Sequence, residues 1–451
     1  MLRRLNPFRD LPNPREVWAW GMYDLANQSF TLLIITLLFS RYVEFVVVGP
    51  DAEGDTGAGK LAWSLIHGGS LLLVVVLSPV VGAIGDLRGW RKQILVFTGV
   101  LCACLTCGLG LVGAGAIALA AALYMPANIC YQIGENFLAS FLPDVSTSRT
   151  IGRISAIGWM MGYVGALLLL IAAMGGMLLF GREDTAAWRP FFIFAGLWFL
   201  IFMIPATLIL RDDDPVADRS DGLLRQSFGR LADTVRQASR YRQLAKFLLA
   251  FFIYGFGVQV IIGFASIIAA GYGFEKVQLV VFVAQITITA GIAAALTMTF
   301  QDRIGAKATV MIYLGVWILS CAGLIAIKLI WPSQGPQWPL WVVGNGLGFG
   351  LGGIGTASRS MVGRFTPRQK RAEFFGLWGF VYKLAGALGV LSFGAVAKLF
   401  GDLASLLLLG SFFIIGLLLI LPVNEVAGVC AARRVERQWA GKRTAKSEKR
   451  T

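Results

Sequence analysis

Twelve long apolar segments recur along the chain, separated by short charged or Gly/Pro-rich breaks. Each has about 20 mainly apolar residues, the length that an α-helix needs to cross a bilayer. Soluble proteins are about a quarter charged, whereas this chain is 14% charged and 57% hydrophobic. The pattern predicts an all-α membrane protein with twelve transmembrane helices at 17–46, 61–84, 93–112, 115–141, 153–180, 189–210, 245–271, 277–300, 308–330, 338–361, 373–397 and 402–422.

Lysine and arginine are distributed unevenly around these segments. Of the 40 bases, 31 lie in the amino terminus, the carboxyl-terminal tail and the connections that follow even-numbered segments, and seven lie on the other side. The positive-inside rule therefore places both termini in the cytoplasm. The net charge of +15 then reflects membrane orientation, so we expect a lipid bilayer and no nucleic acid as partner, and a monomer.

The longest connection lies between the sixth and seventh segments and divides the chain into two halves. We expect a six-helix bundle over 1–210, a cytoplasmic linker over 211–244, a second six-helix bundle over 245–422 and a basic cytoplasmic tail over 423–451. Within the linker, apolar residues at helical spacing among arginines predict either an amphipathic helix on the anionic inner leaflet or a solvated linker helix. An offset of 221 residues indicates parallel repeats: Gly158, Gly165, Ala166 and Leu167 match Gly379, Gly386, Ala387 and Leu388.

Two related loops follow the second and eighth segments. Each combines an acid, a tight-turn glycine and bases, which can form a breakable charge clasp with helix ends of the opposite half. A chance acid in a positive loop is the alternative. The candidate gating residues are Gly82, Asp86, Gly89, Arg91 and Lys92 in the first loop, Asp302, Arg303 and Gly305 in the second, and Glu373 at the start of the eleventh segment.

Polar residues gather in particular segments. An ionisable group in hydrocarbon is costly and faces a cavity or a partner. The charges of two acids and two bases within the segments sum to zero. These residues either bind a proton and a solute or form static salt bridges that fix helix packing. The candidate substrate- and proton-binding residues are Asp24, Asn27, Gln28, Asn128, Gln132, Glu135, Tyr254, Gln259, Asn345, Arg359 and Lys383.

Enzymatic and metal sites lack their usual residues. No pair of aspartates, Ser/His combination or metal triad lies at depth, so we expect no enzyme. The cysteines at 102, 104 and 107 have no histidine nearby and lie in an apolar segment, so we expect no metal. The glycine run over 344–355 follows no strand and precedes no Lys-Ser/Thr, which excludes a phosphate loop. We expect no cofactor, apart from coupling to protons.

Two motifs resemble a known family. Residues 20–30, Trp-Gly-Met-Tyr-Asp-Leu-Ala-Asn-Gln-Ser-Phe, and 352–360, Gly-Gly-Ile-Gly-Thr-Ala-Ser-Arg-Ser, followed by 371–377, are similar to the signatures of the major facilitator branch of fungal vacuolar amino-acid effluxers and their bacterial relatives. The resemblance implies that segments one, four, seven and ten line a central cavity and that three, six, nine and twelve face lipid. It further implies a secondary active transporter of an amino acid or similar small solute, working by alternating access and in the export direction.

Localisation follows from the segments and the resemblance together. We expect an integral multi-pass protein of the bacterial inner membrane, or of the vacuolar membrane if the organism is eukaryotic. The alternative function is a non-transporting assembly or interaction factor that has kept the fold.

Overall fold

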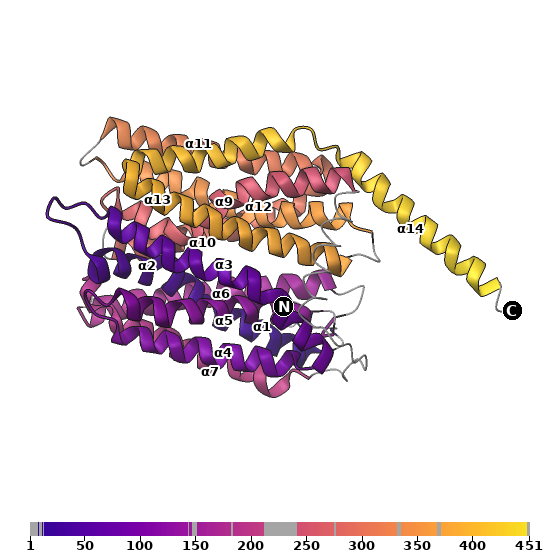
Figure 1. Cartoon of the computed structure of the whole chain (residues 1–451), viewed down its shortest axis with the longest axis horizontal. Helices are drawn as coiled ribbons and strands as arrows, with labels where there is room; N and C mark the ends of the chain where they lie inside the picture. Colours follow the sequence, from indigo (N-terminus) through magenta and orange to yellow (C-terminus); the bar gives the residue numbers. More distant parts are fainter. Residues whose placement is uncertain are drawn as a thin grey trace, which may run out of the picture.

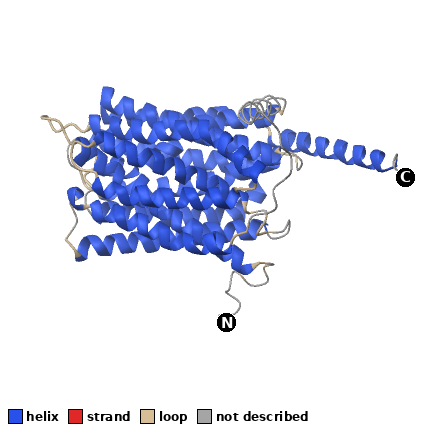
Figure 2. Cartoon of the chain, turned by 60° about the horizontal axis from the view of Figure 1, so that its bottom comes forward, coloured by secondary structure: helices blue, strands red, loops and turns tan. Residues whose placement is uncertain are grey.

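The structure is a bundle of long helices that run side by side (Figures 1 and 2). This computed structural model describes residues 8, 11, 13–142, 144–146, 151–181, 184–211, 241–274, 277–331, 335–367 and 371–448, and every regular element within those ranges is helical. The predicted amphipathic linker helix lies almost wholly outside them. The elements are α1 (Pro14–Gln28), η2 (Ser29–Leu37), α2 (Phe39–Tyr42), η3 (Val43–Val48), α3 (Gly57–Arg88), α4 (Arg91–Gly108), η4 (Leu109–Leu111), α5 (Ile117–Ser140), α6 (Ile151–Leu179), η5 (Thr185–Ala187), α7 (Arg189–Ile209), α9 (Arg242–Ala270), α10 (Val277–Ile304), α11 (Ala306–Ile330), α12 (Trp338–Phe365), α13 (Arg371–Ile420) and α14 (Glu425–Glu448).

Ten helices in the described ranges are long and apolar enough to cross a membrane. The predicted all-α membrane architecture is therefore confirmed, while the count of twelve crossings and the cytoplasmic side of the termini stay predictions. The difference in number has two sources. The predicted segment 338–361 forms α12 but is too rich in glycine and polar residues to rank as apolar, and segments 373–397 and 402–422 both lie in α13.

Helix α13 folds back on itself at Gly401. The backbone there has φ 80° and ψ 180°, a conformation that only glycine adopts without strain. Near the start of α13, Phe374 packs against Tyr241, and just past its end the Pro422 carbonyl accepts a hydrogen bond from Lys246 Nζ. Tyr241 and Lys246 flank the first turn of α9, so both ends of α13 lie at the same end of the bundle. The chain thus crosses the bundle twice within α13.

The first crossing is wider than an ordinary α-helix over much of its length. After α1 the chain continues as π-helix in η2 and again in η3. The Leu38 amide donates to the Leu33 carbonyl at 2.7 Å, and Thr36 Oγ1 donates to the Thr31 carbonyl at 2.9 Å, both five residues back. π-Helical turns are rare and frequently occur at functional sites. Here they directly follow the polar stripe of α1.

Apolar side chains cover the outside of the bundle. Phe97 of α4, Leu208 of α7, Leu319 of α11 and Leu418 in the second half of α13 are all more than half exposed. These elements contain the third, sixth, ninth and twelfth predicted segments, which are expected to face lipid. Exposed apolar side chains in a bundle of this kind require a hydrocarbon surrounding.

The two halves meet tightly at one end, which we call the distal end because the turn over 49–56 lies there and α14 leaves from the opposite, terminal end (Figure 1). Trp63 Nε1 donates to the Gly263 carbonyl at 2.8 Å, and Ser64 Oγ donates to the Val390 carbonyl at 2.7 Å. Ser40 and Ser266 share a hydrogen bond at 3.1 Å. Each of these contacts joins the first half to the second, so the distal end is closed.

Candidate functional site

The polar faces of α1 and α5 lie against each other. Asn27 Nδ2 donates to Glu135 Oε1, and Thr31 Oγ1 donates to the Tyr131 hydroxyl at 2.8 Å. Residues three or four apart in a helix share a face, so the spacing in each helix aligns its polar side chains. Asn27 is buried and Glu135 is half-buried. A carboxylate held by an amide inside a helical bundle can exchange this partner for a solute or a proton.

Glycines of α6 make room for the charged face of α1. A Cβ at Gly158 would lie 2.7 Å from Asp24 Oδ2 and would overlap the Trp20 ring, and a Cβ at Gly162 would lie 3.2 Å from Gln28 Nε2. Small residues let helices approach closely in membranes. Half-buried Asp24 therefore occupies space that any larger residue at 158 would take.

Arg359 enters the site from α12 of the second half. Its guanidinium lies 5.4 Å from the ring centre of Trp159 and 5.9 Å from that of Trp378, one tryptophan from each half. The side chain is exposed in the described part of the chain. Its charge interacts with those of Asp24 and Glu135. A planar guanidinium between two aromatic faces keeps a fixed orientation and can bind a carboxylate through two parallel hydrogen bonds.

Lys383 of α13 reaches across to the first half. Its Nζ donates to Asn136 Oδ1 at 2.7 Å and to the Gln132 carbonyl at 3.3 Å, both in α5. Its charge also interacts with that of Glu135. Two acids from the first half and two bases from the second thus share one region, as a low-dielectric interior requires.

Four other predicted site residues make contacts within their own halves. The Tyr254 hydroxyl and Ser358 Oγ share a hydrogen bond at 2.8 Å inside the second half, and Asn128 Nδ2 donates to Ser70 Oγ at 2.6 Å inside the first. Asn345 Nδ2 donates to the Trp341 carbonyl of its own helix. Gln259 packs against Gly386, where a Cβ would lie 3.0 Å from its Cγ.

The first predicted gating loop contacts its own half. Gly89 ends α3 with φ 63°, and Gly82 has no atom within 4 Å of its Cβ position. Arg91 pairs with Asp144 at 2.8 Å and stacks on Phe141, both in the first half, and the clasp with the opposite half stays a prediction. The side chains of Asp86, Asp302 and Glu373 lie outside the described part of the structure, and that of Lys92 is half-buried.

The second loop is held by an acid that the sequence analysis did not single out. Gly305 has φ 93°, and behind it Glu425 accepts hydrogen bonds from the amides of Ala306 and Lys307 at 3.1 and 2.9 Å. Glu425 also pairs with Arg364 at 2.8 Å, while Arg303 is exposed. A carboxylate at the start of α11 is favourable because the amides there lack intrahelical partners. The first residue of α14 thereby joins α11 to α12.

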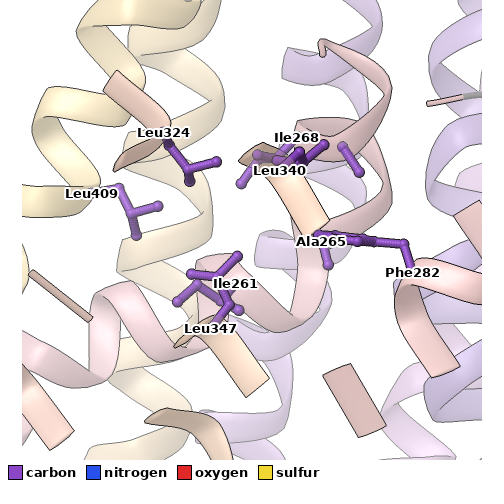
Figure 3. Close-up of a pocket in the computed structure, with 9 residues that line it drawn as sticks. Ile261, Ala265, Ile268, Phe282, Leu324, Leu340, Leu347 and Leu409 are labelled. Carbon is purple, nitrogen blue, oxygen red and sulfur yellow. The ribbon is translucent and has the colours of Figure 1, made fainter. Parts of the chain in front are cut away.

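A separate pocket lies within the second half (Figure 3). Its lining is entirely apolar, so it offers nothing to recognise a charged solute. The lining residues come from α9 to α13 and are Ile261, Ala265, Ile268, Ala269, Phe282, Leu324, Leu340, Leu347 and Leu409.

Sequence reasoning missed Trp159 and Trp378. A signal for them exists, because each tryptophan neighbours one of the two glycines repeated at the offset of 221 residues, Gly158 and Gly379. Their approach to Arg359 depends on the packing of α6 and α13 around α12, which no local pattern encodes.

Comparisons with known proteins agree with this architecture. The model of the family described as "Vacuole effluxer Atg22 like" matches residues 64–433. The chain is similar to an uncharacterized MFS-type transporter, YxiO, of Bacillus subtilis, with 24% identity over 90% of this chain and 94% of that protein. It is also similar to autophagy-related protein 22-2 of Aspergillus clavatus, with 24% identity over 56% of this chain and 44% of that protein.

A solved structure gives the same architecture. The crystal structure of a D-xylose-proton symporter superposes with a TM-score of 0.71 at 14% identity, covering 92% of this chain and 98% of that one. At this identity the likeness concerns the fold, which is the major facilitator fold that the sequence motifs predict.

Proposed function

This chain belongs to the vacuole effluxer Atg22-like family, and we propose that it is a secondary active transporter that exports an amino acid or a similar zwitterion or organic anion by alternating access. It is a multi-pass membrane transporter of the major facilitator type. The observation that supports the finer proposal is the meeting of Asp24 and Glu135 from one half with Arg359 and Lys383 from the other.

The charges suit a solute that carries both signs. Arg359 offers a fixed guanidinium to a carboxylate, and Asp24 offers a carboxylate to an ammonium group. A bound zwitterion would pair with both groups, so the occupied site would carry no unpaired charge. This lowers the cost of holding charged groups inside the membrane while the halves move.

Coupling to protons is proposed on the Glu135 contacts. Glu135 accepts a hydrogen bond from Asn27 in the first half, and its charge interacts with that of Lys383 in the second. A carboxylate between the halves can be neutralised by a proton in one conformation and by a lysine in the other. Transport driven by a pH gradient would then require Glu135.

The test is transport by the purified protein in liposomes. Amino acids and small acids are first screened by thermal shift, because a ligand that binds the folded protein raises its apparent stability. Uptake of the best ligand is then measured with and without a pH gradient. We expect Asp24→Asn and Arg359→Ala to abolish uptake while the elution profile and apparent Tm stay near those of the wild type.

Glu53→Gln is the matched control, because Glu53 is an exposed acid in the distal turn. Full uptake by both site variants would refute the assigned site. No flux of any screened solute, together with a stoichiometric co-purifying protein, would favour a non-transporting assembly factor.

A further inference from the structure

A buried lysine joins the two halves at the distal end. Lys60, at the start of α3, is 8% exposed and forms an ion pair with Asp402, which follows the reversal of α13 at Gly401. Lys328 lies 3.9 Å from the other oxygen of Asp402. Because Lys60 belongs to the first half and Asp402 to the second, the pair must break if the distal end opens. A buried ammonium group left without a partner would make that opening costly.

A second carboxylate lies beside Lys60 within its own half. Glu44 is 1% exposed, and its Oε1 accepts a hydrogen bond from Thr56 Oγ1 at 2.8 Å. Its Oε2 is buried and has no hydrogen-bond partner in the described part of the chain. A Cβ at Gly59 would lie 2.8 Å from the Glu44 Cα, so the first turn of α3 rests directly on the backbone of Glu44.

Other charged groups also lie at this end. Arg41 stacks on Phe45, with 4.5 Å between guanidinium and ring centre, and its charge acts on Glu44 more weakly than that of Lys60. Asp55 and Lys398 form a separate pair between the halves at 3.6 Å. The charges of Glu44 and Lys60 are close enough to interact. Glu44 Oε2 is therefore an acceptor that can receive the Lys60 ammonium group when Lys60 leaves Asp402.

We propose that Lys60 is a gating lysine that exchanges between two carboxylates, Asp402 when the distal end is closed and Glu44 when it is open. The inference rests on the alternating access proposed above. Opening removes Asp402 with the second half, and a rotation of the flexible lysine side chain delivers its ammonium group to Glu44 Oε2. The exchange keeps a buried charge paired in both states, so neither state is trapped.

The experiment measures the distance across the distal end. Spin labels are attached at Ala114→Cys in the first half and Pro336→Cys in the second, both exposed positions outside the ion pairs, after the six native cysteines are replaced. Electron double-resonance distances are recorded on the full chain in lipid nanodiscs without solute. We expect the wild type to be mainly closed, and Asp402→Asn to raise the open-to-closed ratio at least about fivefold.

The decisive variant is the double substitution. Glu44→Gln alone is expected to keep the distal end closed, because Lys60 still has Asp402. In the double variant, Lys60 has no carboxylate in either state, so Glu44→Gln should reverse most of the opening caused by Asp402→Asn. Glu53→Gln, in the exposed distal turn, should leave the open-to-closed ratio of the wild type unchanged.

Two results would overturn the exchange. One is a double variant as open as Asp402→Asn alone, and the other is an unchanged distance in every variant. Both substitutions keep the size of the side chain, so folding is checked by the elution profile and apparent Tm. Because no solute or transport enters the measurement, failure of the transport assay would leave this result standing, and an active transporter with unresponsive distances would refute only the exchange.

Discussion

Arg359 has two tryptophan rings beside its guanidinium. It is flanked by Trp159 and Trp378, and it approaches Asp24 and Glu135 from the opposite half. A lysine at this position would keep the charge but lose the planar face and the fork of donors. The role assigned to Arg359 therefore depends on its shape as well as its charge.

We expect Arg359→Lys to raise the KM for the transported solute about tenfold, which corresponds to about 1.4 kcal/mol of lost binding. The measurement is the concentration dependence of uptake in liposomes. Arg433→Lys, an exposed exchange in α14, is the matched control and should leave the KM unchanged. An unchanged KM in Arg359→Lys would show that only the charge matters.

Two glycines related by the internal repeat give a second residue-scale prediction. A Cβ at Gly158 would meet Asp24 Oδ2 and the Trp20 ring, whereas the Cβ position at Gly379 has no atom within 4 Å. We expect Gly158→Ala to reduce uptake at least about tenfold by displacing Asp24, and Gly379→Ala to leave it near that of the wild type. Equal uptake by the two variants would contradict the assigned position of Asp24.

Individual residues of the site differ in how far the sequence reveals them. Asp24, Glu135, Arg359 and Lys383 are visible because a charge inside an apolar segment is costly enough to need a reason. Which residues they pair with is not visible, since Asn27 lies 108 residues from Glu135 and Asn136 lies 247 residues from Lys383. Glu425 is hidden for another reason: one acid in a basic tail looks like an ordinary surface residue.

At the scale of elements, α12 packs through its glycines rather than through large apolar side chains. Its glycines face two neighbours: a Cβ at Gly352 would overlap the backbone of Ala290 in α10, and one at Gly353 would overlap the Tyr313 ring in α11. Close backbone contact of this kind stabilises helix pairs in a membrane without large apolar side chains. This explains why α12 forms a long helix despite its modest apolar content.

The same helix provides a matched pair of substitutions. We expect Gly352→Ala to lower the apparent Tm, because the backbone of Ala290 cannot move aside and overpacking costs about 1–3 kcal/mol or more. Gly355→Ala, with no atom within 4 Å, should leave the Tm unchanged or raise it slightly, since alanine favours a helix by about 0.5–1 kcal/mol. Thermal unfolding in one detergent compares the two variants. A lower Tm in Gly355→Ala alone would contradict the packing of α12.

The sequence predicts the helices whose bounds follow from the length of an apolar segment. The predicted boundary between 397 and 402 contains Gly401, where α13 reverses. The π-helical stretches η2 and η3 were not predicted, because nothing in the apolar pattern distinguishes a helix of wider turn. The linker helix over 211–244 stays a prediction, with two interpretations still open.

At the scale of the whole molecule, the closed distal end allows the halves to be joined covalently. Ser40 Oγ and Ser266 Oγ are 3.1 Å apart across the boundary between the halves. We expect the double variant Ser40→Cys/Ser266→Cys to form a disulfide under a membrane-permeant oxidant, to lose uptake and to regain it after reduction. Each single cysteine variant is the control. Uptake that persists in the cross-linked protein would exclude movement of the halves at this end.

The all-α membrane architecture was predictable from the apolar segments, whereas the orientation that lysine and arginine indicate stays a prediction. Which end of the bundle is closed was not predictable, since the sequence encodes every conformation of the transport cycle at once. The contacts of Trp63 and Ser64 with the second half belong to one of those conformations.

The anchoring of α14 by Glu425 has a practical consequence for imaging. Helices that a detergent belt surrounds offer little for particle alignment in electron cryo-microscopy. Helix α14 leaves the bundle at the terminal end as a continuous helix (Figure 2), and its first residue is tied to α11 and α12. A helical protein fused in register with α14 would therefore project as a fiducial whose orientation reports that of the second half.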